Sequence, residues 1–344
     1  MAARNGSIRV WKRIDPIDQV SHEMIIFDID VFCSRGILFL EDGAPSMLDL
    51  MPRETDSKIV DEEVRVTHAM SEPQSNLSEF DHPPLIETVL GIEFPPIAGW
   101  GIVHFGLFWQ TIRGDYPRWE VQPAIPPTSD ATLENRGAVP SIILQLGSPP
   151  PLRCWFIDDS GTRLIQVQAD RLIANWRRGG KAGDSAYPRY EQILSGLEKA
   201  WSCFETFLDS EQLPRPKPIR FELSYINHLV RGEEWQSLDE LPLIFRGLRE
   251  LDLSAGSKSP KELDFHAAYP SANEQDSLHV SIKNVFRLVD AREALQFALS
   301  IRGSSDTTST IDPSAWLDRA HDQIVKAFTA LTTDAMHQRW GRQR

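Results

Sequence analysis

The chain has 344 residues, with 36 Lys and Arg against 49 Asp and Glu, a formal net charge of −13 and 41% hydrophobic residues. This composition is typical of a globular protein with a sizeable core, and it excludes the disordered and collagen-like classes. The acidic charge argues against broad electrostatic binding to nucleic acid or to an anionic membrane. Three cysteines without CxxC spacing favour a reducing compartment, and no apolar run is long enough to span a membrane, so we expect a cytoplasmic protein.

Residues 1–79 differ in composition from the rest of the chain. They contain one strand candidate at 24–32 and a short apolar run at 36–40, followed by charged and polar stretches. Two short strands without a covering helix cannot form an independent core. Because Met70 opens a polar stretch that leads into a strand, we expect an N-terminal extension and a working protein that begins near Met70. A genuine edge hairpin is the alternative.

From residue 86, strand-like segments rich in β-branched and aromatic residues alternate with helical segments. The first half predicts a strand at 86–94, a helix at 101–113, strands at 119–124, 141–146, 152–158 and 163–176, and a helix at 188–208. The last helix has apolar residues at three-and-four spacing from Tyr190 to Leu208. One face of this helix is therefore expected to pack on a core.

The second half repeats the order strand, short helix, strands, long helix. Its segments are a strand at 218–230, a short helix at 238–249, strands at 261–268, 277–286 and 293–302, and a helix at 313–338. A proline-rich linker at 213–218 cannot continue a helix and separates the halves 80–212 and 213–344. The pattern predicts an α+β fold with a pseudo-duplicated antiparallel sheet and long helices packed on one face, as in helix-grip and TATA-box-binding-protein-like modules.

The sharpest polar signal is a run that includes Gln166, Gln168, Asp170, Arg171, Asn175, Trp176 and Arg177. On a strand, Gln166, Gln168 and Asp170 share one face, because side chains alternate. The functional interpretation is a polar sheet face on which Arg171 and Arg177 meet an anionic group and Trp176 supplies a stacking surface. The alternative is a turn at Asp170 and Arg171, with Asn175 satisfying backbone groups and Trp176 in the core.

Further candidate binding residues lie outside this run. Tyr187 and Tyr190 open the following helix and can frame the same pocket, and the second half adds Tyr225, Asn227 and His228. His228, His266 and His279 all lie on predicted strands, where they could together bind a metal ion. The alternative is that they are ordinary strand histidines without a ligand. The latter are favoured, because the sequence has no HExxH or close pair of ligands. We therefore assign no metal and no cofactor.

Two aspartate motifs imitate those of haloacid-dehalogenase phosphatases. Asp28 and Asp30 follow an apolar run, as in their nucleophile loop, and Asp158 and Asp159 imitate their metal-binding pair. The other elements of such a site are unassigned. The segment 158–161 is better interpreted as a hairpin turn in which Gly161 adopts a positive φ.

Three stretches carry a resemblance to a known family. They run from His82 to Phe94 (HPPLIETVLGIEF), from Leu164 to Arg178 (LIQVQADRLIANWRR) and from Tyr187 to Glu191 (YPRYE). In these the chain resembles a sporadically distributed, uncharacterised prokaryotic family, over residues 80–341. The resemblance implies a conserved fold and a place in mobile or defence-associated gene islands. It supplies no established activity, so no catalytic residue is carried over.

These observations favour a binding or accessory protein over an enzyme. The expected partner is a protein encoded by a neighbouring gene, which binds the polar face of the sheet; nucleic acid or a small ligand is less favoured there, and no membrane is expected. The alternative is a hydrolase or nuclease-like effector with a site around Asp170, Arg171 and Asn175.

Overall fold

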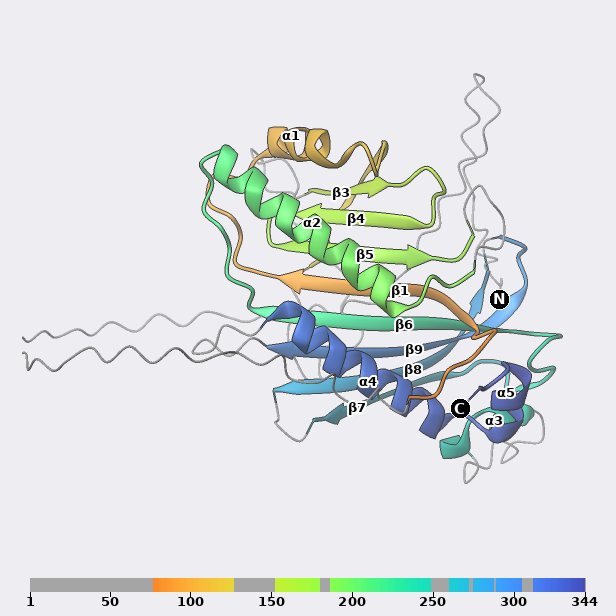
Figure 1. Cartoon of the computed structure of the whole chain (residues 1–344). Helices are drawn as coiled ribbons and strands as arrows, with labels where there is room; N and C mark the ends of the chain where they lie inside the picture. Colours follow the sequence, from red (N-terminus) through yellow and green to blue (C-terminus); the bar gives the residue numbers. More distant parts are fainter. Residues whose placement is uncertain are drawn as a thin grey trace, which may run out of the picture.

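The computed structural model describes residues 77–126, 152–179, 186–248, 260–271, 275–287, 289–304 and 312–343. Several predictions fall outside the described residues: most of the N-terminal extension, the start near Met70, the Asp28 and Asp30 motif, and the strand at 141–146. The described residues form a mixed α+β fold around one nine-stranded sheet (Figure 1). None of the helices they contain is long and apolar enough to cross a membrane.

The elements follow one another in an order that places strands before each long helix. In the first half they are β1 (Leu85–Glu93), α1 (Ile102–Ile112), β2 (Arg118–Pro123), β3 (Leu152–Ile157), β4 (Arg163–Gln168), β5 (Arg171–Arg177) and α2 (Tyr190–Ser210). In the second half they are β6 (Arg220–Val230), the 3-10 helix η2 (Leu238–Glu240), α3 (Leu241–Ile244), the 3-10 helix η3 (Arg246–Leu248), β7 (Asp264–Pro270), β8 (Asp276–Phe286), β9 (Glu293–Ser304), α4 (Pro313–Leu331) and α5 (Asp334–Arg339).

The sheet is antiparallel throughout, with the strand order β2-β3-β4-β5-β1-β6-β9-β8-β7. The antiparallel arrangement predicted from short connections is therefore confirmed. β1 and β6 pair at the centre, where Leu90 lies opposite Leu223. Both strands are buried along most of their length, as expected for central strands with neighbours on either side.

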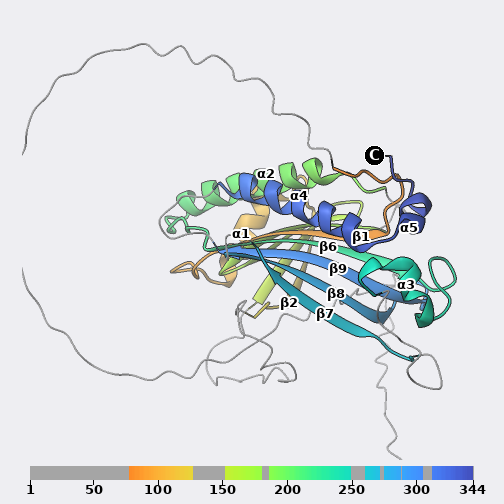
Figure 2. The same ribbon diagram turned by 90° about the horizontal axis from the view of Figure 1, so that it is seen from below.

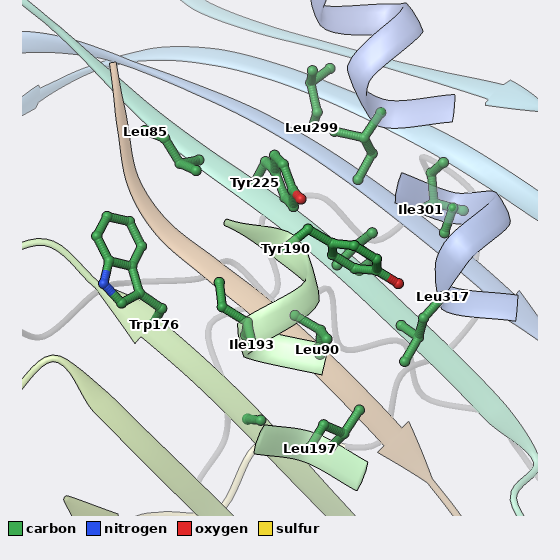
Figure 3. Close-up of a cluster of buried hydrophobic side chains, with 14 of the residues drawn as sticks. Leu85, Leu90, Trp176, Tyr190, Ile193, Leu197, Tyr225, Leu299, Ile301 and Leu317 are labelled. Atoms are coloured by element: carbon green, nitrogen blue, oxygen red, sulfur yellow. The ribbon is translucent and has the colours of Figure 1, made fainter. Parts of the chain in front are cut away.

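The long helices α2 and α4 lie side by side over one face of the sheet, with α2 against β5 and β1 and α4 against β6 and β9 (Figure 2). The predicted apolar stripe of α2 is buried there, including Ile193, Leu197 and Phe204. These side chains join one large core with residues from the sheet and from α4 (Figure 3). We call this the covered face; no helix of the described residues lies on the opposite, uncovered face (Figure 2).

Two predicted elements were wrong because a short interruption was missed in each. The strand expected at 163–176 is two antiparallel strands, β4 and β5, joined by a tight turn at Ala169 and Asp170. The helix expected at 313–338 ends at Leu331, and α5 begins after Thr333, whose hydroxyl accepts a hydrogen bond from the Met336 amide at 3.5 Å. A threonine in this position satisfies an amide of the first turn and so favours a new helix start.

The hairpin interpretation of residues 158–161 is confirmed. Asp158 Oδ1 accepts hydrogen bonds from the amides of Gly161, Thr162 and Arg163 at 2.8, 3.0 and 3.1 Å, and Gly161 has a φ of 81°. Burial alone would raise the pKa of Asp158, but hydrogen bonds from Ser160 and Arg163 outweigh it and lower the pKa. These contacts identify Asp158 as the residue that organises the turn between β3 and β4.

Candidate binding site

The predicted binding residues divide between the two faces of the sheet. The uncovered face carries Gln166, Gln168, Arg171, Asn175, Arg177 and His228, whereas the covered side holds Trp176, Tyr187, Tyr190, Tyr225 and Asn227. Alternation along β5 and β6 causes the split, because neighbouring residues point to opposite faces. The candidates therefore form two separate groups.

On the uncovered face, a directional chain of hydrogen bonds crosses four strands. Arg153 Nη1 and Trp155 Nε1 of β3 donate to Gln166 Oε1 at 2.7 and 2.8 Å. Gln166 Nε2 donates to Asn175 Oδ1 at 2.7 Å, and Asn175 Nδ2 donates to Glu87 Oε1 of β1 at 2.7 Å. We call these five residues the polar chain. Each amide in it is held in one orientation, because its oxygen accepts from one neighbour and its nitrogen donates to the next.

Glu87, the last residue of the polar chain, is a buried carboxyl group with a raised pKa. Its side chain is buried, and its Oε2 atom has no hydrogen-bond partner among the described residues. Burial raises the pKa of Glu87 to about 7, although the hydrogen bond from Asn175 and the nearby charges of Arg177 and Arg153 act to lower it. Glu87 is thus a carboxyl group that changes its charge near neutral pH.

A second group on this face surrounds Arg171, which is only 4% exposed. Its Nε donates to Asp170 Oδ1 at 3.2 Å, Nη1 donates to Glu93 Oε1 at 3.3 Å, and Nη2 donates to the Pro126 carbonyl at 3.3 Å. Gln168 is also occupied, because its amide bonds both the N–H and the carbonyl of Ile125. The prediction that Arg171 meets an external anion does not fit this geometry, since its nitrogens already donate to protein oxygens.

The predicted stacking role of Trp176 beside Arg171 and Arg177 is wrong. Trp176 lies in the core, 2% exposed (Figure 3). Its ring meets that of Tyr187 edge to face at a centroid distance of 5.2 Å. The aromatic neighbour of Arg177 is Trp155, whose ring centroid is 5.8 Å from the guanidinium carbon. The core placement weighed as the alternative for Trp176 is confirmed.

The covered side contains a cavity of about 600 Å³ between the first turns of α2 and the middle of α4. We call it the α2–α4 pocket. Its floor is formed by Leu85, Tyr225 and Asn227; its walls by Tyr187, Arg189, Tyr190, Glu191, Asp318, His321, Asp322, Ile324, Val325 and Phe328; and its mouth by Leu77, Ser78, Glu79, Phe80 and Pro83. The volume lies in the range of pockets that bind small organic molecules.

Three aromatic side chains form a hydrogen-bonded chain in this pocket. The hydroxyls of Tyr187 and Tyr225 are 3.2 Å apart, and the Tyr225 hydroxyl is 2.8 Å from His321 Nδ1. Tyr190 stacks on the His321 ring at a centroid distance of 4.1 Å and donates its hydroxyl to Asp318 Oδ1 at 3.0 Å. Figure 3 shows Tyr190 of α2 beside Tyr225 of β6. The contacts join α2, α4 and β6 around the cavity.

Burial keeps the groups of this chain in their neutral forms. It raises the pKa of Tyr187 to about 12 and raises the pKa values of Tyr190 and Tyr225 as well. Burial also lowers the pKa of His321. At neutral pH the pocket therefore presents three phenols and an uncharged imidazole.

Arg189, at the start of α2, has a strained backbone beside the pocket. Its φ of 74° and ψ of 157° lie in a region that residues other than glycine rarely adopt. Such a conformation costs on the order of 1–3 kcal/mol and concentrates at functional sites. Here the Arg189 Nη1 atom donates to the Phe80 carbonyl at 3.3 Å, which ties the strained residue to the mouth of the pocket.

Several pocket residues were not among the predicted binding residues. His321 and Asp318 are three residues apart on α4, so they share a face that a helical wheel would have identified as polar within an apolar stripe. What the sequence could not show is that this face meets Tyr190. That contact depends on the central pairing of β1 with β6, which brings α2 and α4 together.

His228 lies on the uncovered face, away from the pocket. Burial lowers its pKa to about 4, and its Nε2 atom has no hydrogen-bond partner among the described residues. His266 and His279, on β7 and β8, have ring centroids 5.7 Å apart. Within the described residues, no group of three or more histidine, cysteine or acidic side chains is arranged to hold a metal ion.

No protein-family model matches the chain, and a comparison with curated proteins found no match.

Proposed function

We propose that the protein is a binding or accessory protein whose ligand occupies the α2–α4 pocket. The observation that carries the proposal is a cavity of about 600 Å³ with polar groups, the Tyr225 hydroxyl and the Asn227 amide, at its buried floor. Polar groups that converge on a cavity fix the orientation of a bound molecule. The strained backbone of Arg189 at the same pocket supports the proposal.

The fold assigned to this function consists of two related halves, 80–212 and 213–344. Two features support the duplication. The first strand of each half pairs with the last strand of that half, β1 with β5 and β6 with β9, and the helix that follows each last strand lies on the covered face. This is the arrangement expected of helix-grip or TATA-box-binding-protein-like halves joined through β1 and β6.

We also propose that the protein acts together with a protein partner encoded by a neighbouring gene in a mobile or defence-associated gene cluster. The region available on the uncovered face is formed by β7, β8 and β9, where Ser281 and Gln296 are half-buried. The polar chain and the Arg171 group are less suitable, because their central side chains are buried and bonded within the protein.

A hydrolase or nuclease-like effector is the second candidate function. It is favoured by Glu87, because a carboxyl group with a pKa of about 7 suits general acid or base chemistry, and Asn175 of the predicted site contacts it. If this candidate is correct, Glu87→Gln abolishes a measurable turnover. Under the binding proposal, Glu87→Gln leaves ligand binding in the α2–α4 pocket unchanged.

Native mass spectrometry of the full chain, purified from its own host without a denaturing step, tests the binding proposal. We expect a retained small-molecule adduct on the wild type. Asn227→Leu removes a polar group from the floor at nearly constant volume, and Val325→Trp fills the cavity, so each is expected to lose the adduct. Gln323→Ala, on an exposed position of α4 outside the pocket, should keep it.

Two results would contradict the proposal. One is a wild-type protein without an adduct; the other is an adduct kept by both pocket variants. Circular dichroism and thermal unfolding of each variant separate loss of binding from loss of fold, and Val325→Trp serves if Asn227→Leu is unstable.

A further inference from the structure

The floor of the α2–α4 pocket contains an acceptor to which no described residue donates a hydrogen bond. Asn227 is 2% exposed, and its Nδ2 donates to the Phe297 carbonyl at 3.0 Å. No described residue donates a hydrogen bond to its Oδ1 atom, which is not among the enclosed side-chain atoms without a partner and therefore reaches the cavity. A molecule in the pocket that brings an N–H or O–H group can donate to this oxygen.

The charges around the pocket select among such donors. Four carboxylates line it, those of Glu79, Glu191, Asp318 and Asp322, against one guanidinium, that of Arg189. The formal charge of the described lining is thus −3 with His321 neutral. Carboxylates around a partly enclosed cavity favour a cation inside it and repel an anion.

Aromatic surfaces favour the same kind of ligand. The stacked rings of Tyr190 and His321, together with Tyr187, Phe80 and Phe328, all border the cavity. The face of a tyrosine or phenylalanine ring attracts an ammonium group, and its breadth accommodates an apolar body. Ile324 and Val325 extend the apolar part of the wall.

We infer that the ligand of the α2–α4 pocket is a small organic cation, a primary or secondary amine with an apolar or aromatic body. This inference rests on the proposed function. Its ammonium group donates to Asn227 Oδ1 and lies in the field of the four carboxylates, and its body packs against the aromatic wall. A neutral alcohol of the same shape satisfies Asn227 but gains nothing from the carboxylates. A carboxylic acid of the same shape, ionised at neutral pH, is repelled.

Ligand-observed NMR titration of the full chain with matched amine, alcohol and carboxylate probes tests this inference. The set is 2-phenylethylamine, 2-phenylethanol and phenylacetate, with the corresponding cyclohexyl and butyl compounds. We expect the amines to bind about tenfold more tightly than the alcohols, and the carboxylates to bind most weakly. Asp322→Asn should weaken amine binding about two- to fivefold and leave alcohol binding unchanged. Gln323→Ala is the control.

The outcomes separate the inference from the proposed function. If alcohols or carboxylates bind as tightly as the amines, and Asn227→Leu and Val325→Trp abolish that binding, the cation preference is wrong and the pocket remains the binding site. If no probe binds, or if the two pocket variants bind all probes as the wild type does, both the inference and the proposed function are wrong.

Discussion

Replacing Trp176 with alanine lowers the free energy of unfolding by about 3–5 kcal/mol. The indole is 2% exposed and packs against Tyr187 in the core beneath α2, so truncation leaves a cavity that neighbouring side chains fill only in part. Urea denaturation, followed by circular dichroism because the substitution removes a fluorophore, measures the change. This is among the largest effects we expect for a single substitution.

Trp119 supplies the matched control, because its side chain is 58% exposed on β2. Trp119→Ala should change the free energy of unfolding by no more than about 0.5 kcal/mol. Equal, small effects of the two substitutions would place Trp176 outside the core. The prediction that Trp176 supplies a stacking surface on the polar face would then be supported.

Glu87→Gln removes a pH-dependent penalty from the folded state. The pKa of Glu87 is about 7 in the fold against an ordinary value of 4.5, so the folded state binds a proton that the unfolded state has released. Wild-type stability therefore falls as the pH rises from 4.5 to about 7, by about 3 kcal/mol for this group. Glutamine keeps the oxygen that accepts from Asn175 and has no charge to bury.

The measurement is the difference in unfolding free energy between Glu87→Gln and the wild type across this pH range. We expect the variant to gain about 3 kcal/mol relative to the wild type between acidic and mildly alkaline pH. Glu120→Gln, on an exposed residue of β2, is the control. A difference that does not change with pH would mean that folding does not raise the pKa of Glu87, and general acid or base chemistry by this residue would lose its support.

Much of the fold could be predicted because local signals were strong. The apolar stripe from Tyr190 to Leu208 predicted α2, and the prolines of residues 213–218 marked the boundary before β6. The predicted strand at 163–176 ran through the turn at Ala169 and Asp170, because this turn has no glycine or proline and lies between two apolar strand segments. The alternative interpretation of the polar run did include a turn, one residue later, at Asp170 and Arg171. The sequence does indicate the break before α5, since Thr333 followed by Asp334 is a common helix start. These two residues lie within a continuous amphipathic pattern, which favoured one long helix.

The candidate site was predicted only in part, for a geometric reason. Alternation along a strand separates Trp176 from Arg177, and it places Tyr225 and Asn227 together away from His228. The polar run around Gln166 was a genuine signal, but its side chains bond mainly to one another across the strands. The pocket required the meeting of α2 with α4, a long-range consequence of the sheet order that no local pattern contains.

The central claim is that the α2–α4 pocket, and not the polar chain of the uncovered face, binds the ligand. A crystal structure of the full chain, purified without a denaturing step, tests it most directly. We predict a small molecule in the pocket with a donor within hydrogen-bond distance of Asn227 Oδ1. A pocket filled only by water or by protein side chains, with a molecule bound instead beside Glu87 and Asn175, would contradict the account.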